Sequence, residues 1–205
     1  MTKKPGDSWF LYYRAKTLLY LEDQENALRD FAQVEKLQTA SLFLRASALT
    51  MSAMALSELG QLDAAMTAIH RSLELVSQQS LAHYVAGEIL YQRGQYQQAS
   101  QHYEQVRLSL SEDSSEHALH GDLYITAEKK YYKLGCCDLA QGAIRSAFVH
   151  FRSGIRANPK SADCFYGMSK ALKIMNKSEM AAESLTLARQ YDPEWRELSD
   201  LSAQP

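Results

Sequence analysis

The sequence predicts an all-α protein built as a solenoid of stacked helical hairpins, and three observations support this. Residues of matching size recur at an interval of 34 positions, and a fixed period of this length is typical of repeat architectures. Gly60 and Gly94 show the same interval, and each glycine separates one helical pattern from the next. The chain is rich in alanine, leucine, glutamine, serine and glutamate, with only four prolines and nine glycines, which favours helix.

The composition argues against several classes of protein. The chain has 205 residues, of which 46% are hydrophobic and 22% charged, as is typical of a globular rather than a disordered protein. Its formal net charge is -2 and no basic stripe is evident along the sequence, so we expect no nucleic-acid binding. Cys136, Cys137 and Cys164 are too few and too irregular for a disulfide framework, and we interpret them as reduced, packed thiols.

No segment of the sequence predicts insertion into a membrane. The apolar run over residues 9–21 is interrupted by Arg14 and Lys16, which is unlike a signal-peptide core and unlike a transmembrane helix. We therefore expect a cytoplasmic protein.

Five units of one kind account for most of the chain. Each unit has alanine as its twentieth residue, a small residue as its eighth and a large residue as its twenty-fourth. In a helical hairpin, small residues must face each other for the two backbones to approach, and the large residue then fills the space toward the next unit. The predicted repeats cover about residues 8–41, 46–79, 80–113, 128–161 and 162–193.

Two insertions interrupt the period. Residues 42–45 are expected to lengthen the start of a helix by about one turn. Residues 114–127 are expected to extend the first helix of the fourth unit, giving one helix over about 115–141. The alternatives for this insert are a division into two helices at Gly121-Asp122 and a loop without helix.

The C-terminal residues predict a short capping helix over 193–203. Asp192 is suited to cap a helix, and Pro193 is suited to the first helical position. The apolar residues Trp195, Leu198 and Leu201 would cover the open face of the last repeat. Repeats, insert and cap together are expected to form a single domain over 1–205.

The units resemble the tetratricopeptide repeat, a helix-turn-helix unit of 34 residues. The resemblance covers about residues 8–193, and it departs from the family pattern at Asp138, where an aromatic residue is usual, and at Arg14, where leucine is usual. It implies a right-handed superhelix in which the first helix of each hairpin lines a concave groove. The fourth unit matches the pattern best, with Tyr131, Leu134, Gly135, Ala147, Phe151 and Pro159.

The resemblance also implies which side chains face the groove. The fifth residue of each first helix would do so, which gives Tyr12, Thr50, Tyr84, Tyr132 and Tyr166. Charged residues at or beside further groove positions are Lys16, Glu88, Lys129, Lys133, Lys170 and Lys173. Tyrosines would supply contact area and the lysines would favour acidic side chains of a partner. The alternatives are that tyrosine is merely common at this position of the family, and that the lysines are simply solvated.

The sequence offers little for catalysis or for metal binding. His117 and His120 lie three residues apart, but no third ligand stands at a recognised spacing, so we predict no metal site. We find no nucleophile elbow, no phosphate-binding glycine loop and no zinc-protease motif. We therefore predict neither a catalytic residue nor a cofactor.

The expected function is that of a non-catalytic adaptor or scaffold that binds a peptide or helical segment of a partner protein in the groove. A second hypothesis is a structural subunit of a complex, or a homodimer, that docks through the convex face or through residues 114–127. A third is a co-chaperone. Lys129 and Lys133 fit one part of the clamp that holds chaperone tails, but Thr50 and Met54 stand where lysine and asparagine are needed.

Overall fold

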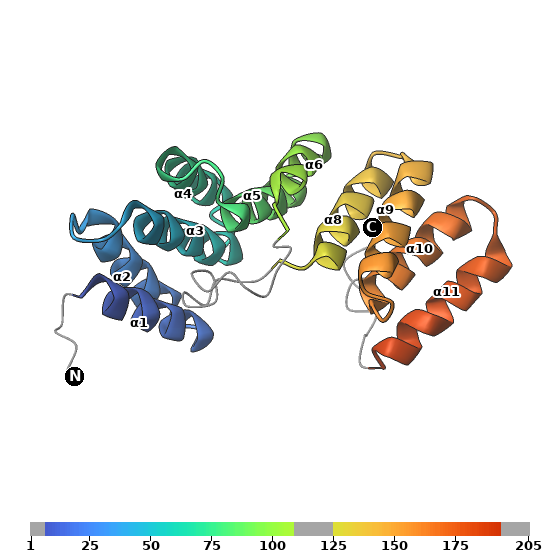
Figure 1. Ribbon diagram of the computed structural model, residues 1–205, viewed down its shortest axis with the longest axis horizontal. Coiled ribbons are helices and arrows are strands. Elements are labelled where there is room, and N and C mark those ends of the chain that lie inside the picture. Colours follow the sequence, from blue (N-terminus) through green and yellow to red (C-terminus); the bar gives the residue numbers. More distant parts are fainter. Residues whose placement is uncertain (1–6, 109–124, 194–205) are drawn as a thin grey trace. The chain divides into compact units, whose positions relative to one another are not determined.

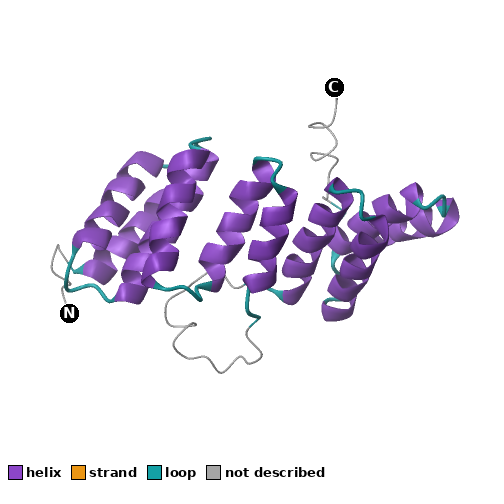
Figure 2. Ribbon diagram, turned by 90° about the horizontal axis from the view of Figure 1, so that it is seen from above, coloured by secondary structure: helices purple, strands orange, loops and turns teal. Residues whose placement is uncertain are grey.

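The computed structural model describes residues 7–108 and 125–193, and every regular element in these ranges is an α-helix (Figures 1 and 2). The predicted all-α class and the succession of helical hairpins are confirmed. The predicted capping helix over 193–203 lies outside the described residues, apart from Pro193. The helices are α1 (Ser8–Tyr20), α2 (Gln24–Lys36), α3 (Leu42–Glu58), α4 (Leu62–Leu75), α5 (Ser80–Gln92), α6 (Tyr96–Gln105), α8 (Ala127–Ala140), α9 (Ile144–Ala157), α10 (Ala162–Ile174) and α11 (Ser178–Tyr191).

The chain divides into two compact units. Unit 1 comprises residues 1–95 and 105–107, and unit 2 comprises residues 96–104 and 108–205. The boundary therefore falls inside the third predicted repeat, between α5 and α6. The expected single domain over 1–205 stays a prediction, and each unit is described by itself below.

Within each unit, a helix contacts its hairpin partner and the first helix of the next hairpin. In unit 1, α2 packs against α1 and α3, and α4 packs against α3 and α5. In unit 2, α9 packs against α8 and α10, and α10 packs against α11. Lys130 of α8 donates a hydrogen bond to the backbone carbonyl of Glu104 at 2.9 Å, which attaches the end of α6 to unit 2. Partial burial lowers the pKa of the Lys130 ammonium.

The three residue positions that define the repeat are in the core. The small residues at the eighth and twentieth positions are buried in all five repeats. Phe31, Ile69, Tyr103 and Phe151, at the twenty-fourth position, are at most 1% exposed, whereas Leu185 of the last repeat is half-buried. The repeat positions that the sequence predicts to be in the core are thus the positions that pack there.

The turn inside each hairpin has the same backbone conformation in all five repeats. The fifteenth residue of each repeat has a positive φ: 73° at Gly60, 72° at Gly94, 74° at Gly142, 61° at Glu22 and 58° at Asn176. In every turn, the next residue's N–H donates to the carbonyl five residues earlier, for example Gln61 to Leu56 at 2.8 Å. This is the Schellman arrangement that satisfies the last carbonyls of a helix, and it favours glycine at the left-handed residue.

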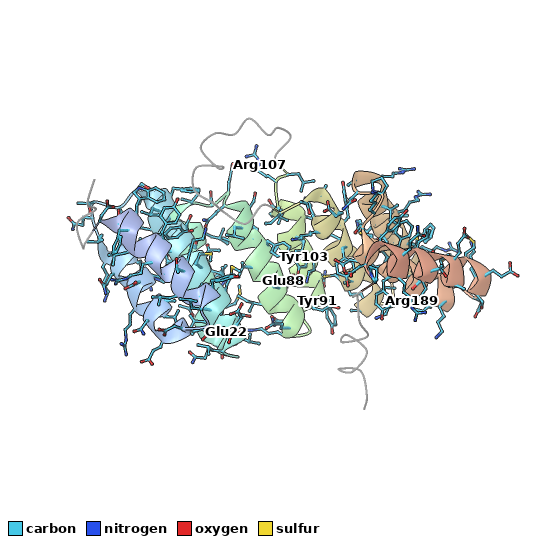
Figure 3. All side chains as sticks on the ribbon, turned by 90° about the horizontal axis from the view of Figure 1, so that it is seen from below. Glu22, Glu88, Tyr91, Tyr103, Arg107 and Arg189 are labelled. Carbon is cyan, nitrogen blue, oxygen red and sulfur yellow. The ribbon has the colours of Figure 1, made fainter. Side chains whose placement is uncertain are left out.

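Glu22→Gly is therefore expected to stabilise unit 1, by roughly 0.5–1 kcal/mol, because glycine avoids the steric cost of a left-handed side chain. Glu22 lies at the exposed turn between α1 and α2, so no packing is lost (Figure 3). The midpoint of urea unfolding, followed by circular dichroism, measures the change. Gly60→Ala, at the equivalent turn, should shift the midpoint in the opposite direction. A lower midpoint for Glu22→Gly would contradict the turn geometry.

The two insertions have different outcomes. Helix α3 has 17 residues where α5 and α10 have 13, so residues 42–45 do lengthen the start of a helix by about one turn. The predicted continuous helix over 115–141 is wrong. Helix α8 begins at Ala127, and Thr126 before it is extended, with φ -75° and ψ 157°. The extended backbone at Thr126 ends any continuity between residues 114–127 and α8, and residues 109–124 lie outside the described part of the chain.

Both departures from the repeat pattern have a polar partner on the second helix of the same hairpin. Arg14 on α1 donates two hydrogen bonds of 2.6 Å to the carboxylate of Asp30 on α2, which is 4% exposed. Asp138 on α8 lies 2.8 Å from Nδ1 of His150 on α9, and the His150 ring stacks on Tyr131. Each hairpin thus replaces an apolar contact by a polar one that links the same two helices.

Candidate partner-binding surface

The structure corrects one predicted contact residue of unit 1. Tyr12 is only 1% exposed, and its ring packs edge-on against Phe31 of α2, with 5.8 Å between the ring centroids. Its side chain therefore belongs to the core of the first hairpin and offers no contact area to a partner. Lys16, also predicted to face the groove, lies over the rings of Tyr12 and Tyr13 at 5.7 and 5.9 Å.

Thr50, at the equivalent position of the second repeat, is also buried. Its hydroxyl lies 2.9 Å from that of Ser72 and 3.0 Å from Oε1 of Gln79, and all three side chains are at most 6% exposed. Gln79 in turn donates to the hydroxyl of Ser47 at 3.1 Å. This network links α3, α4 and the start of α5, so Thr50 specifies how neighbouring hairpins pack rather than what they bind.

Tyr84 and Glu88 are half-buried on successive turns of α5, where their spacing of four residues places them on one side of the helix (Figure 3 labels Glu88). Together with Lys16, they are the predicted partner-contact residues of unit 1 whose side chains stay partly exposed.

Unit 2 brings together most of the other predicted residues, on α8 and α10. Lys170 lies over the ring of Tyr166, with its Nζ 4.2 Å from the ring centroid. The thiol of Cys136 is close enough to Tyr132 for a hydrogen bond and is within the electrostatic influence of Lys133 and Lys170. We call Tyr132, Lys133, Cys136, Tyr166 and Lys170 the α8–α10 cluster.

The two tyrosines of the cluster also support the core. Tyr132 is half-buried and packs against Phe151 at 6.0 Å between ring centroids. Tyr166 is 7% exposed and belongs to an apolar group with Phe165 and Ala188. The exposed part of the surface is consequently basic. Lys133 is half-buried, and Lys170 is exposed, as are Lys129 and Lys173 on the same two helices.

The cluster contains the thiol of Cys136, for which the sequence predicts only a packing role. Burial raises the pKa of Cys136 to about 12, although the hydrogen bond from Tyr132 and the charges of both lysines lower it. Burial likewise raises the pKa of Cys164 to about 11, where the thiol lies against Gly154 of α9. All three cysteines are free, in agreement with the interpretation as reduced thiols.

We expect Cys136 and Cys164 to react slowly with iodoacetamide at pH 8 in the folded protein and rapidly in urea, because the thiolate is the reactive form. An ordinary thiol has a pKa near 8.5, so only the unfolded chain ionises appreciably as the pH rises past that value. The raised pKa values therefore make the native state less stable above about pH 9. Mass spectrometry of the alkylated peptides measures the rates at which Cys136 and Cys164 are labelled with and without urea. Equal labelling of Cys136 with and without urea would contradict its burial.

Other kinds of site find no support among the described residues. In residues 7–108 and 125–193, no three histidine, cysteine or acidic side chains are grouped closely enough to hold a metal ion. His117 and His120 lie outside these ranges. Within the same ranges, no helix has both the length and the apolar character that crossing a membrane requires.

Comparison with known proteins identifies the repeat and the fold. Residues 46–76 match the model of the tetratricopeptide repeat family, and they coincide with the second predicted repeat. No curated protein matches the chain in sequence. Among solved structures, MamA of Desulfovibrio magneticus RS-1 is similar with a TM-score of 0.70 and 19% identity, over 92% of this chain and 97% of that one.

Two further structures have the same fold. YrrB, described as a tetratricopeptide protein with an unusual peptide-binding site, has a TM-score of 0.65 and 16% identity, over 97% of this chain and 93% of that one. Cut9, in its hetero-tetramer with Hcn1 from the APC/C, has a TM-score of 0.74 and 14% identity, over 97% of this chain and 36% of that one. At these identities the likeness concerns the fold alone.

Proposed function

We propose that this chain, which is a tetratricopeptide-repeat protein by its family match and by its fold, is a non-catalytic scaffold that binds an acidic segment of a partner protein on the α8–α10 cluster. The observation that carries the proposal is the placement of Lys133 and Lys170 around a partly buried aromatic and thiol surface. The predicted groove residues Lys129 and Lys173 are exposed on the same two helices and would extend the basic surface.

The chemistry of the cluster favours carboxylates over other ligands. A lysine over a tyrosine ring is held in place, because the ring face attracts the ammonium, and it loses less freedom when a carboxylate binds. Lys133 is half-buried and Lys170 is exposed, and both act electrostatically on the partly buried Cys136, so a carboxylate bound there would meet two cations beside an apolar surface. An acidic side chain with an adjacent apolar residue would use both properties.

The comparisons support binding of a protein, without naming one. YrrB is described as having a peptide-binding site, and Cut9 as part of a hetero-tetramer. Repeat proteins of this kind expose a surface that is large for their mass, which suits association with other chains. The cytoplasmic location, the absence of catalysis and the possibility of a homodimer stay predictions.

The test is a pull-down from a lysate of the source organism with three forms of the chain. These are the wild type, Lys133→Glu/Lys170→Glu, and the control Lys36→Glu/Lys177→Glu, whose exposed lysines lie on α2 and at the start of α11. Both double variants change the net charge equally. We expect a partner that is retained by the control and lost from the first variant. Retention by both variants would exclude the α8–α10 cluster as the binding surface.

A further inference from the structure

Helix α9 carries a basic stripe that the proposed function does not use. Arg145, Arg152 and Arg156 are exposed, and so is Val149 between them, with 47% of its surface accessible. At 100° per residue these four positions lie within about 60° of one another around the helix. The buried residues of α9 (Ala147, Phe151 and Gly154) are on the opposite side. We call these four exposed residues the α9 stripe.

Within the described part of the chain, no acidic side chain pairs with the arginines of the stripe. Helix α9 has no aspartate or glutamate, and none of the three arginines forms an ion pair with any residue that the structure describes. Elsewhere in those residues, Arg14, Arg29, Arg71 and Arg93 each bind a carboxylate. Of the three, only Arg152 has a contact with another described side chain, at 5.9 Å from the centroid of the Phe148 ring. Arg45, Arg107 and Arg189 also lack an ion pair in those residues, so what distinguishes the stripe is that three such arginines share one side of one helix.

Arg145 is also placed where it does not help the helix. It is the second residue of α9, and a cation in the first turn is unfavourable because the helix dipole is positive at that end. No side chain caps this N-terminus. The helix dipole therefore does not favour an arginine at this position, which is consistent with a role outside the folded chain.

We propose that the α9 stripe binds an acidic helix of a partner protein. From Arg145 to Arg156 the stripe is about 16 Å long and straight, because all its residues belong to one helix. A partner helix with carboxylates at the same intervals would pair with all three arginines and place an apolar residue on Val149. Arginine suits this role, since its planar guanidinium binds a carboxylate through two hydrogen bonds.

Nucleic acid and anionic membrane fit the stripe less well. Binding to phosphate backbones depends on many cations and on an overall basic domain, whereas this chain has a net charge of -2 and the stripe three cations. Membrane binding of a surface helix needs a broad apolar face, and Val149 is the only large apolar side chain that is exposed on α9. A partner helix is the ligand that uses the spacing of three charges along one line.

The experiment measures binding of two fluorescent alanine-rich peptides of about 20 residues to the full chain by anisotropy. In the aligned peptide, three glutamates and one leucine occupy one side of the helix at the intervals of the stripe. In the scattered peptide, the same residues are spread around the helix. The proteins are the wild type, Arg145→Glu/Arg152→Glu/Arg156→Glu, and the control Lys36→Glu/Lys177→Glu/Arg189→Glu, whose basic residues are exposed elsewhere (Figure 3 shows Arg189 on α11).

We expect the aligned peptide to bind the wild type and the control about tenfold more tightly than it binds the arginine variant, since three exposed pairs are lost. The scattered peptide should bind at least several-fold more weakly than the aligned one, and raising the salt concentration should weaken both. Circular dichroism checks that every variant stays helical. Equal affinity of the two peptides, or of the two triple variants, overturns the proposal.

Two further binding measurements test other ligands and distinguish binding on the α9 stripe from binding on the α8–α10 cluster. A labelled DNA duplex or vesicles with phosphatidylserine that bind the stripe more tightly than the aligned peptide would overturn the proposal. Because the α8–α10 cluster would also attract an acidic peptide, the criterion is the preference between the two peptides: Lys133→Glu/Lys170→Glu should keep the preference for the aligned over the scattered peptide, which the arginine variant loses. If Lys133→Glu/Lys170→Glu loses this preference, the peptide is on the α8–α10 cluster, and the stripe is not its site. The proposal for the α9 stripe and the proposal for the α8–α10 cluster can therefore be rejected independently.

Discussion

Phe151→Ala is expected to lower the free energy of unfolding of unit 2 by about 3–5 kcal/mol, the range found when a buried aromatic side chain is removed. Phe151 is fully buried on α9, and its ring packs against Tyr132 of α8 and against Gly167 of α10. A Cβ placed on Gly135 of α8 would lie 2.5 Å from its ring, and one placed on Gly167 of α10 would lie equally close to Cζ. One ring thus fills the space that two glycines leave, so its loss creates a cavity between two consecutive hairpins.

Urea unfolding followed by circular dichroism measures this loss, and Phe148→Ala is the matched control. Phe148 is on the same helix but half-buried, with Arg152 over its ring. Its removal should cost clearly less, about 1–2 kcal/mol, because less apolar surface is exposed and little cavity forms. If Phe151→Ala lowers the free energy of unfolding no more than Phe148→Ala does, the Phe151 ring does not hold α9 against α8 and α10.

The fold was predictable because its determinants recur at fixed positions. A side chain at the twenty-fourth position that is large in five successive units carries information that a single hydrophobic residue does not, and all five lie in or against the core. The turn at Glu22 departs from the repeat in sequence but not in structure. The sequence has no glycine there, yet the backbone adopts the same left-handed conformation, because the two helices of the hairpin fix it.

The insert was predicted wrongly because hydrophobic spacing alone does not show where a helix starts. Leu119, Leu123 and Ala127 continue the apolar spacing of the fourth repeat, which suggested one long helix. The start of α8 is decided instead by the extended backbone at Thr126. Two adjacent β-branched residues, Ile125 and Thr126, favour this conformation, and they are the local signal that was available in the sequence.

The candidate site was only partly predictable, because position within a repeat does not determine exposure. Tyr12 and Thr50 occupy the same position as Tyr84, but the first packs on Phe31 and the second is enclosed by a polar network. Such partners come from other helices and are not visible in the local sequence. The α9 stripe was missed for a different reason. Its arginines are seven and four residues apart, so they form a stripe only once they are placed on a helix.

Gly167→Val is expected to destabilise unit 2 by about 2–3 kcal/mol, at the upper end of the cost of overpacking a core. A side chain at this position would overlap the ring of Phe151, which is enclosed on all sides and has no space into which to move. Valine has a higher helix propensity than glycine, so an exposed glycine at mid-helix would give the opposite sign. The direction of the change in urea midpoint therefore distinguishes a packed glycine from an incidental one.

The double variant Phe151→Ala/Gly167→Val tests whether the two residues share one space. If they do, the methyl groups of valine fill part of the cavity that alanine leaves, and the double variant should be less destabilised than the sum of the single variants by at least about 1 kcal/mol. Gly135 provides a second cycle, because it faces the same edge of the ring from α8. Additive effects in both cycles would mean that Phe151 does not connect the two hairpins, whereas coupling in both would establish the ring as the contact that fixes α8, α9 and α10 together.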